Sequence, residues 1–197
     1  MKTQLDTEID SIPHQGLREL TRLVMQTCPD CFWTMPASTS GKYHPAISLG
    51  SGGLVRHTRA VVHLTRHMLE WEGVDPENPN YSAAIAAAIM HDCCKKTDAE
   101  KHTAFTHPLR AVELIERVAA AHPTLLVPPA TLRTTCAIVA AHMGRWNTSR
   151  HAAVTLPEPC TPLQRCVSIA DFLASRKDVP VTLEPQSGGG GTLENIG

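Results

Sequence analysis

An apolar, alanine-rich run from Ser82 to Met90 ends directly on His91 and Asp92, and this feature constrains the chain most. The run is typical of a buried helix. A carboxylate at its end needs a partner, because burying an unpaired charge costs several kcal/mol or shifts its pKa until it is neutral. The imidazole beside it suggests a metal ion. Adjacent residues on a helix point about 100° apart, so both could bind one ion only where the helix ends or widens. The alternative is a surface His-Asp pair at a fraying helix end.

Composition favours a single helical domain. With 197 residues the chain can bury one core and is short for two. Aromatic residues are few, whereas Ala, Leu and Val are plentiful. The net charge of −1 provides no strong field toward nucleic acid or membrane, so an anionic substrate must be held by a local cluster of cations. The eleven histidines are many for this length and give a first compositional hint of metal chemistry.

The sequence predicts a cytoplasmic protein with reduced thiols. No segment has the order of a signal peptide, and no apolar run approaches the length of a membrane span. Seven cysteines is an odd number, and the neighbours Cys93 and Cys94 would not ordinarily bridge each other. Cys28 and Cys31 have zinc-ligand spacing, but a second pair with comparable spacing is absent, so their role stays open.

Apolar residues at helical spacing predict the elements of the domain. The expected helices cover Gln15 to Thr27, Leu54 to Trp71, the Ser82–Met90 run, a segment that begins near His107, Thr131 to Met143, and Pro162 to Arg176. Long irregular segments from Cys28 to Gly53 and from Gly144 to Thr161 separate them. Residues 1–13 are expected to form a flexible arm, 14–178 the domain, and 179–197 a flexible tail.

Six residues able to ligate a metal fall on inward helix faces or at helix ends. They are His57, His91, Asp92, His107, His142 and Asp171. Any one of them alone is better explained as a core histidine or a capping carboxylate, but six in one helical chain indicate a metal site. Four imidazoles and two carboxylates suit Mn, Fe, Co, Ni or Zn rather than Ca, with Mg as a further alternative.

The order of these residues resembles the HD superfamily of metal-dependent phosphohydrolases. The sequence motifs on which the resemblance rests are Gly52-Gly53-Leu54-Val55-Arg56-His57-Thr58, His91-Asp92 with Lys95, His107-Pro108, His142-Met143-Gly144 and Ala170-Asp171-Phe172-Leu173-Ala174-Ser175-Arg176. Pro36-Ala37-Ser38 and His44, which precede them, are similar to the HD domain of YhaM-type 3′→5′ exoribonucleases. The chain also looks like small stand-alone HD proteins of phages and bacteria. The resemblance covers about residues 30 to 177.

The resemblance implies a fold and a set of roles. The expected fold is an all-α, single HD-domain bundle of six or seven helices with long active-site loops. His57, His91, Asp92 and Asp171 would hold a first metal ion, and His107 and His142 a second, with Asp92 bridging the two. Asp92 and Lys95 are the expected catalytic residues, because Lys95 could neutralise charge on a phosphate in the transition state. The alternative for Lys95 is an ordinary lysine at a helix end.

Five further residues are expected to bind the substrate. Lys42, Tyr43 and His44 precede the His57 helix and could line the mouth of a cleft. Arg145 and Trp146 directly follow His142 and could bind phosphate and stack on a base, respectively. Packing beneath a loop is the alternative for Trp146. Arg176 is either a phosphate ligand or a basic charge at a helix C-terminus.

Three functions follow from this interpretation. The leading one is hydrolysis, by metal-activated water, of a phosphate ester of a nucleotide: a deoxynucleoside triphosphate, a monophosphate, a dinucleotide or a short oligonucleotide. The second is a di-iron oxygenase with the same six ligands, and the third is a nucleotide-binding regulatory module. The expected ligand is a small nucleotide, with short single-stranded nucleic acid as an alternative. No membrane partner is expected, and homo-oligomerisation is left open.

Overall fold

The computed structural model describes residues 4–38 and 41–183, and every regular element in them is helical. The α-helices are α1 (Asp6–Asp10), α2 (Gln15–Thr27), α3 (Gly53–Trp71), α4 (Pro79–Met90), α5 (His107–Ala121), α6 (Pro129–Ala141) and α7 (Pro162–Ala174). Short 3₁₀ turns lie between them: η1 (Asp30–Trp33), η2 (Ala46–Ser48), η3 (Pro123–Leu125) and η4 (Gly144–Trp146). The expected all-α bundle of six or seven helices is confirmed. None of the helices described here is long and apolar enough to cross a membrane.

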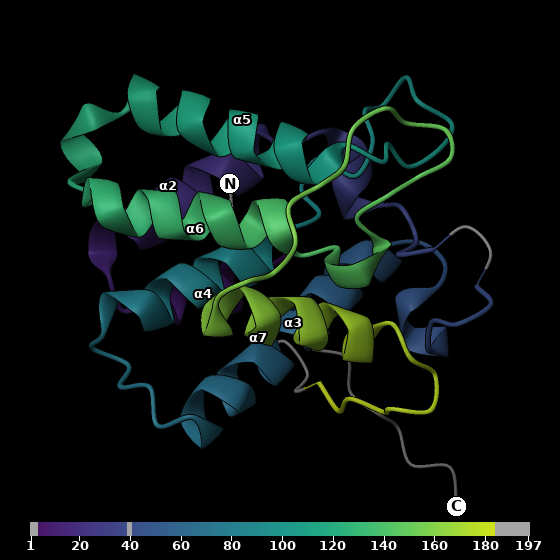
Figure 1. The fold of residues 1–197 in the computed structure, drawn as a ribbon, viewed down its shortest axis with the longest axis horizontal. Coiled ribbons are helices and arrows are strands. Elements are labelled where there is room, and N and C mark those ends of the chain that lie inside the picture. Colours follow the sequence, from purple (N-terminus) through teal and green to yellow (C-terminus); the bar gives the residue numbers. More distant parts are fainter. Residues whose placement is uncertain (1–3, 39–40, 184–197) are drawn as a thin grey trace, which may run out of the picture.

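Helix α4 forms the centre of the bundle. Asn78 caps its N-terminus, since its side chain accepts a hydrogen bond from the backbone of Asn80. Every residue from Tyr81 to Met90 is buried, as expected of a helix that is apolar all round. It packs against α2, α3, α6 and α7, and in Figure 1 it lies between the α5–α6 pair above and the α3–α7 pair below.

The connections between helices place particular helix ends side by side. Helices α5 and α6 are joined by η3 and run in opposite directions, so α5 begins where α6 ends (Figure 1). Helix α7 packs against α3, and its own start is fixed by a capping box between Thr161 and Gln164. One end of the bundle therefore gathers the starts of α3 and α5 and the ends of α4, α6 and α7.

Residues 1–13 are expected to form a flexible arm, but the described part of this segment contains a helix that packs against the bundle. Leu5, Ile9 and Ile12 are fully buried, and α1 packs against α2 and α4. These three residues recur at helical spacing, but polar and acidic residues between them conceal the stripe. At the other end, Val181 and Leu183 pack partly against the core. The remainder of the expected tail, residues 184–197, lies outside the described residues.

The segment before α3 fixes where that helix begins. The backbone N–H of Gly52, which has a φ of 69°, donates to the carbonyl of Thr34 at 3.0 Å. A Cβ added to Gly53 would lie 2.3 Å from the carbonyl oxygen of Ser48, so only glycine fits at this position. This close approach sets the first turn of α3 and hence the position of His57.

Candidate metal centre

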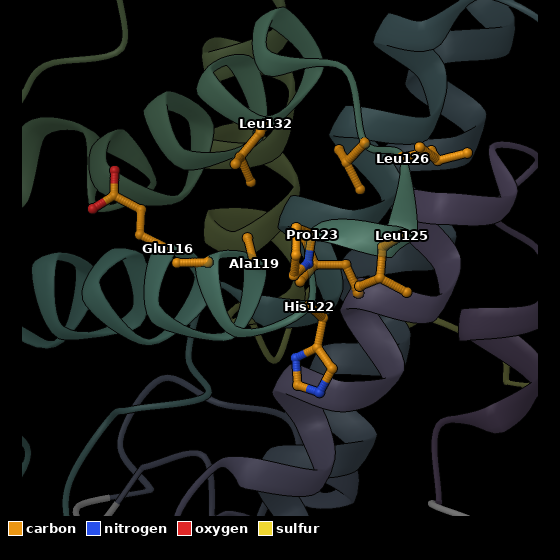
Figure 2. A pocket seen from close by; sticks show the side chains of 10 residues that line it. Glu116, Ala119, His122, Pro123, Leu125, Leu126 and Leu132 are labelled. Atoms are coloured by element: carbon orange, nitrogen blue, oxygen red, sulfur yellow. The ribbon is translucent and has the colours of Figure 1, made fainter.

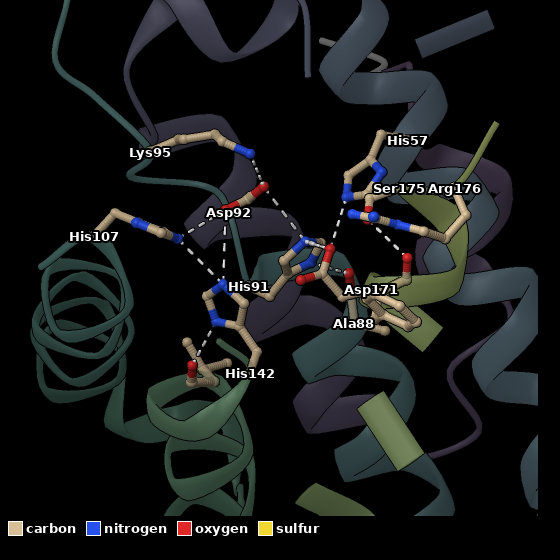
Figure 3. Close-up of polar contacts among 12 residues, drawn as sticks. His57, Ala88, His91, Asp92, Lys95, His107, His142, Asp171, Ser175 and Arg176 are labelled. Carbon is tan, nitrogen blue, oxygen red and sulfur yellow. Dashed lines mark hydrogen bonds and ion pairs between the residues drawn. The ribbon is translucent and has the colours of Figure 1, made fainter. Parts of the chain in front are cut away.

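All six predicted metal ligands lie at the end of the bundle where α4, α6 and α7 terminate. His91 and Asp92 follow the last residue of α4, His142 follows α6, and Asp171 lies in the last turn of α7. The C-terminal end of a helix carries a partial negative charge, so three such ends favour a cation at this place. Figure 3 shows these side chains pointing toward one another.

A first group able to hold a metal ion consists of His57, His91 and Asp171, whose ligand atoms all lie within 4.8 Å of one another. His57 Nε2 lies 2.9 Å from Asp171 Oδ1, and His91 Nε2 lies 3.7 Å from the same oxygen. Both imidazoles are buried, whereas Asp171 is partly exposed. The group therefore has a solvent-facing side.

A second group consists of Asp92, His107 and His142, and all three are buried. Asp92 Oδ1 lies 3.0 Å from His107 Nε2 and 3.8 Å from His142 Nε2. The other oxygen, Oδ2, lies 3.5 Å from His91 Nε2 and so faces the first group. Asp92 thus presents one oxygen to each group, which is the arrangement expected of a bridging carboxylate.

Hydrogen bonds to backbone carbonyls orient three of the four imidazoles. The Nδ1–H groups of His91, His107 and His142 donate at 2.8 Å to the carbonyls of Ala88, Ala104 and Val139, respectively. Figure 3 shows the contact between His91 and Ala88. Donation from Nδ1 leaves Nε2 as the nitrogen that can ligate a metal ion, and outer hydrogen bonds of this kind position imidazole ligands in metal sites.

The Nε2 atoms of these imidazoles lie close together. His107 Nε2 and His142 Nε2 are only 3.1 Å apart, and His91 Nε2 is buried with no hydrogen-bond partner. Ligand atoms on bonds of about 2.1 Å at right angles are about 3 Å apart, close to the shorter contacts of both groups. The donor set therefore fits divalent metal ions.

The buried surroundings favour a neutral His142 and charged Asp92 and Asp171, which are the protonation states that ligation requires. Burial, together with the neighbouring His91 and His107, lowers the pKa of His142 to about 3, so its imidazole is neutral near pH 7. Burial alone would raise the pKa of Asp92, but the charges of Lys95 and His91 hold it well below its usual range. For Asp171 the hydrogen bond from His57 likewise outweighs burial and lowers the pKa of the carboxyl.

A cleft of about 320 Å³ opens onto both groups. Of the five residues expected to bind substrate, His44 and Trp146 line it, whereas Lys42, Tyr43 and Arg145 do not. Trp146 is 45% exposed, so packing beneath a loop does not account for it. Lys95 lines the cleft, with Nζ 2.6 Å from Asp92 Oδ2.

The cleft also contains residues that the sequence analysis did not assign to it. Phe172, Ser175 and Arg176, all near the end of α7, line its wall. Helix α7 ends at Ala174, so Arg176 lies beyond it, where its guanidinium donates to Ser175 Oγ at 3.0 Å. In the sequence, these residues are linked to the site only because they closely follow Asp171. This proximity leaves the role of Arg176 open.

A separate cavity of about 280 Å³ lies between the end of α5, η3 and the start of α6 (Figure 2). Its lining is mostly apolar and includes neither metal-capable group. The seven cysteines are free, and neither metal-capable group of the described residues includes one. Cys28 and Cys31 donate instead to the carbonyls of Met25 and Lys96.

Comparison with known protein families identifies a domain in this chain. The family model for the HD domain matches residues 54–176, which is more than half of the chain and spans all six metal-capable residues. No curated protein and no solved structure gives a match. The particular likeness to YhaM-type exoribonucleases receives no support. The match over residues 54–176 and the helical bundle with its His and Asp groups show that the chain belongs to the HD domain family.

Proposed function

We propose that this protein is a metal-dependent phosphohydrolase that acts on a phosphate ester of a nucleotide. The observation that carries the proposal is the convergence of imidazole Nε2 atoms on Asp92 at the floor of a cleft that also holds Lys95. Bound divalent ions would supply Lewis acidity and lower the pKa of water enough to form a nucleophile near pH 7. The chain's own residues hold the ions and position the ester.

Lys95 is the residue placed best to act on the phosphate. Its ammonium lies within the cleft and is paired with Asp92 Oδ2 at 2.6 Å. A phosphate that enters the cleft meets this charge, which stabilises the negative charge that develops on the transferred group. Arg176 lines the same cleft and offers a second cation to a phosphate oxygen.

The organic part of the substrate is proposed to be a nucleoside because aromatic surface lies beside these cations. Trp146 and Phe172 form one side of the cleft, with ring centroids 5.5 Å apart and planes inclined by 27°. A cleft of about 320 Å³ falls within the range of small-molecule sites. The absence of a large net charge favours small or short substrates over long nucleic acid.

The second candidate is oxygen activation at a di-iron centre, for which the same ligands would serve. Lys95 and Arg176 favour the hydrolase, because two cations beside the ligands suit a phosphate and have no evident task in oxygen chemistry. A regulatory module that binds nucleotide without turnover is the third candidate.

The test is an assay of purified protein with Mn²⁺ against a panel of nucleoside mono-, di- and triphosphates, dinucleotides and short oligonucleotides. We expect phosphate release or ester cleavage that is absent from the His91→Ala, Asp92→Ala double variant. Turnover no higher than that of the variant would contradict the proposal. Binding without turnover would support the regulatory module, and a mixed-valent iron signal after aerobic loading would support the oxygenase.

A further inference from the structure

Three aromatic rings and two arginines lie in a row at the mouth of the cleft. The guanidinium carbon of Arg176 lies 5.1 Å from the ring centroid of Tyr43 and 4.6 Å from that of Phe172. The Phe172 ring stacks on Trp146, and the guanidinium of Arg145 lies 4.6 Å from the Trp146 ring. We call these five residues the aromatic–arginine row.

The row is assembled from three segments that are distant in the sequence. Tyr43 comes from the segment before η2, Arg145 and Trp146 from η4, and Phe172 and Arg176 from the end of α7. The backbone N–H of Lys177 donates to the carbonyl of Tyr43 at 2.8 Å, which ties the first segment to the third.

Gly144 ties the second segment to the third. It has a φ of 58°, and a Cβ added to it would lie 2.5 Å from Ser168 Oγ on α7, so η4 approaches α7 closely. The row is therefore held by the fold.

The row extends beyond the metal cleft in two directions. Trp146, Phe172 and Arg176 line the cleft, whereas Tyr43 and Arg145 do not. On one side of Trp146 lies an adjoining pocket of about 350 Å³, mostly apolar and lined by Arg145, Phe172 and Ile169 among others. On the opposite side the row continues through Arg176 to Tyr43. A mononucleotide with its phosphate at the metal centre would leave part of this surface uncovered.

The rings of Tyr43 and Trp146 are partly exposed to solvent. Tyr43 is 51% exposed and Trp146 is 45% exposed, although both belong to residue types that bury well. Exposed aromatic rings beside arginines are the elements with which proteins bind single-stranded nucleic acid, since bases stack on the rings and phosphates pair with the cations.

We propose that the substrate of this site is a short single-stranded oligonucleotide of two or more nucleotides rather than a mononucleotide. One phosphodiester would lie at the metal centre, the flanking bases would stack on Trp146 and Tyr43, and neighbouring phosphates would pair with Arg145 and Arg176. This inference rests on the proposed function, of which it narrows the substrate class. Because the net charge of the chain is only −1, we expect it to bind short strands in preference to long ones.

Calorimetric titration of the Mn²⁺-loaded protein tests this inference. The ligands are 5′-phosphorylated deoxyadenosine oligomers of one, two and three nucleotides with phosphorothioate linkages. We expect the dissociation constant to fall at least ten-fold from one nucleotide to three, a change that corresponds to about 1.4 kcal/mol. The Trp146→Ala and Tyr43→Ala variants should each weaken binding of the trinucleotide about ten-fold, and the double variant should abolish the length dependence.

Trp71→Ala is the matched control. Trp71 is 88% exposed at the end of α3 and takes no part in the row, so its removal should leave all three dissociation constants unchanged. Equal affinity for one and three nucleotides, or trinucleotide binding unaffected by Trp146→Ala, would overturn the inference.

Cleavage of the corresponding natural phosphodiesters is measured in parallel. Turnover of mononucleotides at a rate that does not rise with substrate length would support the proposed hydrolase and overturn the oligonucleotide inference. Length-dependent binding without any cleavage would support the binding row and contradict the proposed function.

Discussion

The contact between Lys95 and Asp92 admits two physical roles. Lys95 Nζ lies 2.6 Å from an oxygen of Asp92 that faces the first metal-capable group, and it also lines the cleft. The ammonium either balances the carboxylate charge or stabilises charge on the substrate. The two roles give different outcomes when the charge is removed.

We predict that Lys95→Ala lowers kcat by about 10²–10³-fold while the metal content stays the same, because a single preorganised donor to the transition state is worth about this much. Steady-state kinetics and elemental analysis of the same preparation measure both quantities. Lys96→Ala is the control, since Lys96 Nζ donates to the carbonyl of Glu100 and does not line the cleft. Tighter metal binding with unchanged kcat would assign Lys95 to charge balance alone.

The depressed pKa of His142 predicts how the stability of the metal-free protein depends on pH. The pKa of this imidazole is about 3 in the folded protein and about 6.5 in an unfolded chain. Between these values the unfolded state binds the additional proton, so the free energy of unfolding falls as the pH falls. The slope that one such group contributes is at most about 1.4 kcal/mol per pH unit.

The measurement is urea denaturation of chelator-treated protein at pH 7, 6 and 5, with His142→Gln in parallel. The glutamine does not titrate, so the stability advantage of the original protein over the variant should shrink toward pH 5. Asp92 and Asp171 contribute mainly at lower pH, because their unfolded-state pKa is about 3.9. A constant difference across this range would contradict the prediction.

At the scale of helices, the start of α3 depends on the absence of a side chain at Gly53. A Cβ there would meet the carbonyl group of Ser48 and the Cα of Pro36, which are backbone atoms that cannot rotate away. We predict that Gly53→Ala lowers the free energy of unfolding by about 1–3 kcal/mol, the usual cost of overpacking, and weakens metal binding because His57 moves with its helix.

Chemical denaturation and metal titration of Gly53→Ala check both effects. Gly73→Ala is the matched control, because Gly73 has a φ of 67° but no atom within 4 Å of the added Cβ. It should lose stability through backbone strain and keep its metal affinity. Unchanged metal affinity in Gly53→Ala would show that the position of the ligands does not depend on how α3 begins.

The helices could largely be predicted from the sequence, because apolar periodicity reflects which face each helix buries. Helix α4 is the clearest case, since ten consecutive buried residues leave no other interpretation. Helix α1 was missed because Leu5, Ile9 and Ile12 form a short stripe among charged residues. Its burial depends on contacts with the neighbouring α2 and with α4, which is far away in the sequence.

The candidate site was predictable to the extent that its residues are chemically distinctive. Histidines and aspartates at helix ends stand out, and the structure brings all six together. The aromatic–arginine row was not predictable as a row, since ordinary residues from three separate segments form it. Tyr43 and Arg145 were expected at the cleft, but their contribution depends on Arg176 and Phe172, which fill the space between them.

At the scale of the whole molecule, the metal centre joins five helices at one end of the bundle. The Nε2 atoms of His107 and His142 lie 3.1 Å apart in the buried interior. The ligands are brought together in the folded state only, so metal binding should raise the free energy of unfolding.

We predict that chelation lowers the melting temperature and that Mn²⁺ restores it. A metal concentration 100-fold above the dissociation constant contributes about 2.7 kcal/mol, which corresponds to about 5–10 °C for a chain of this size. Calorimetry of the metal-free and metal-loaded protein measures the shift. The exposed pair His63 and His67, with Nε2 atoms 3.2 Å apart on α3, is a competing site for a divalent ion. The His63→Ala, His67→Ala variant should therefore keep the full shift, whereas His91→Ala should lose most of it. The opposite pattern would place the stabilising ion on the surface of α3 and leave the buried histidines without a demonstrated ligand role.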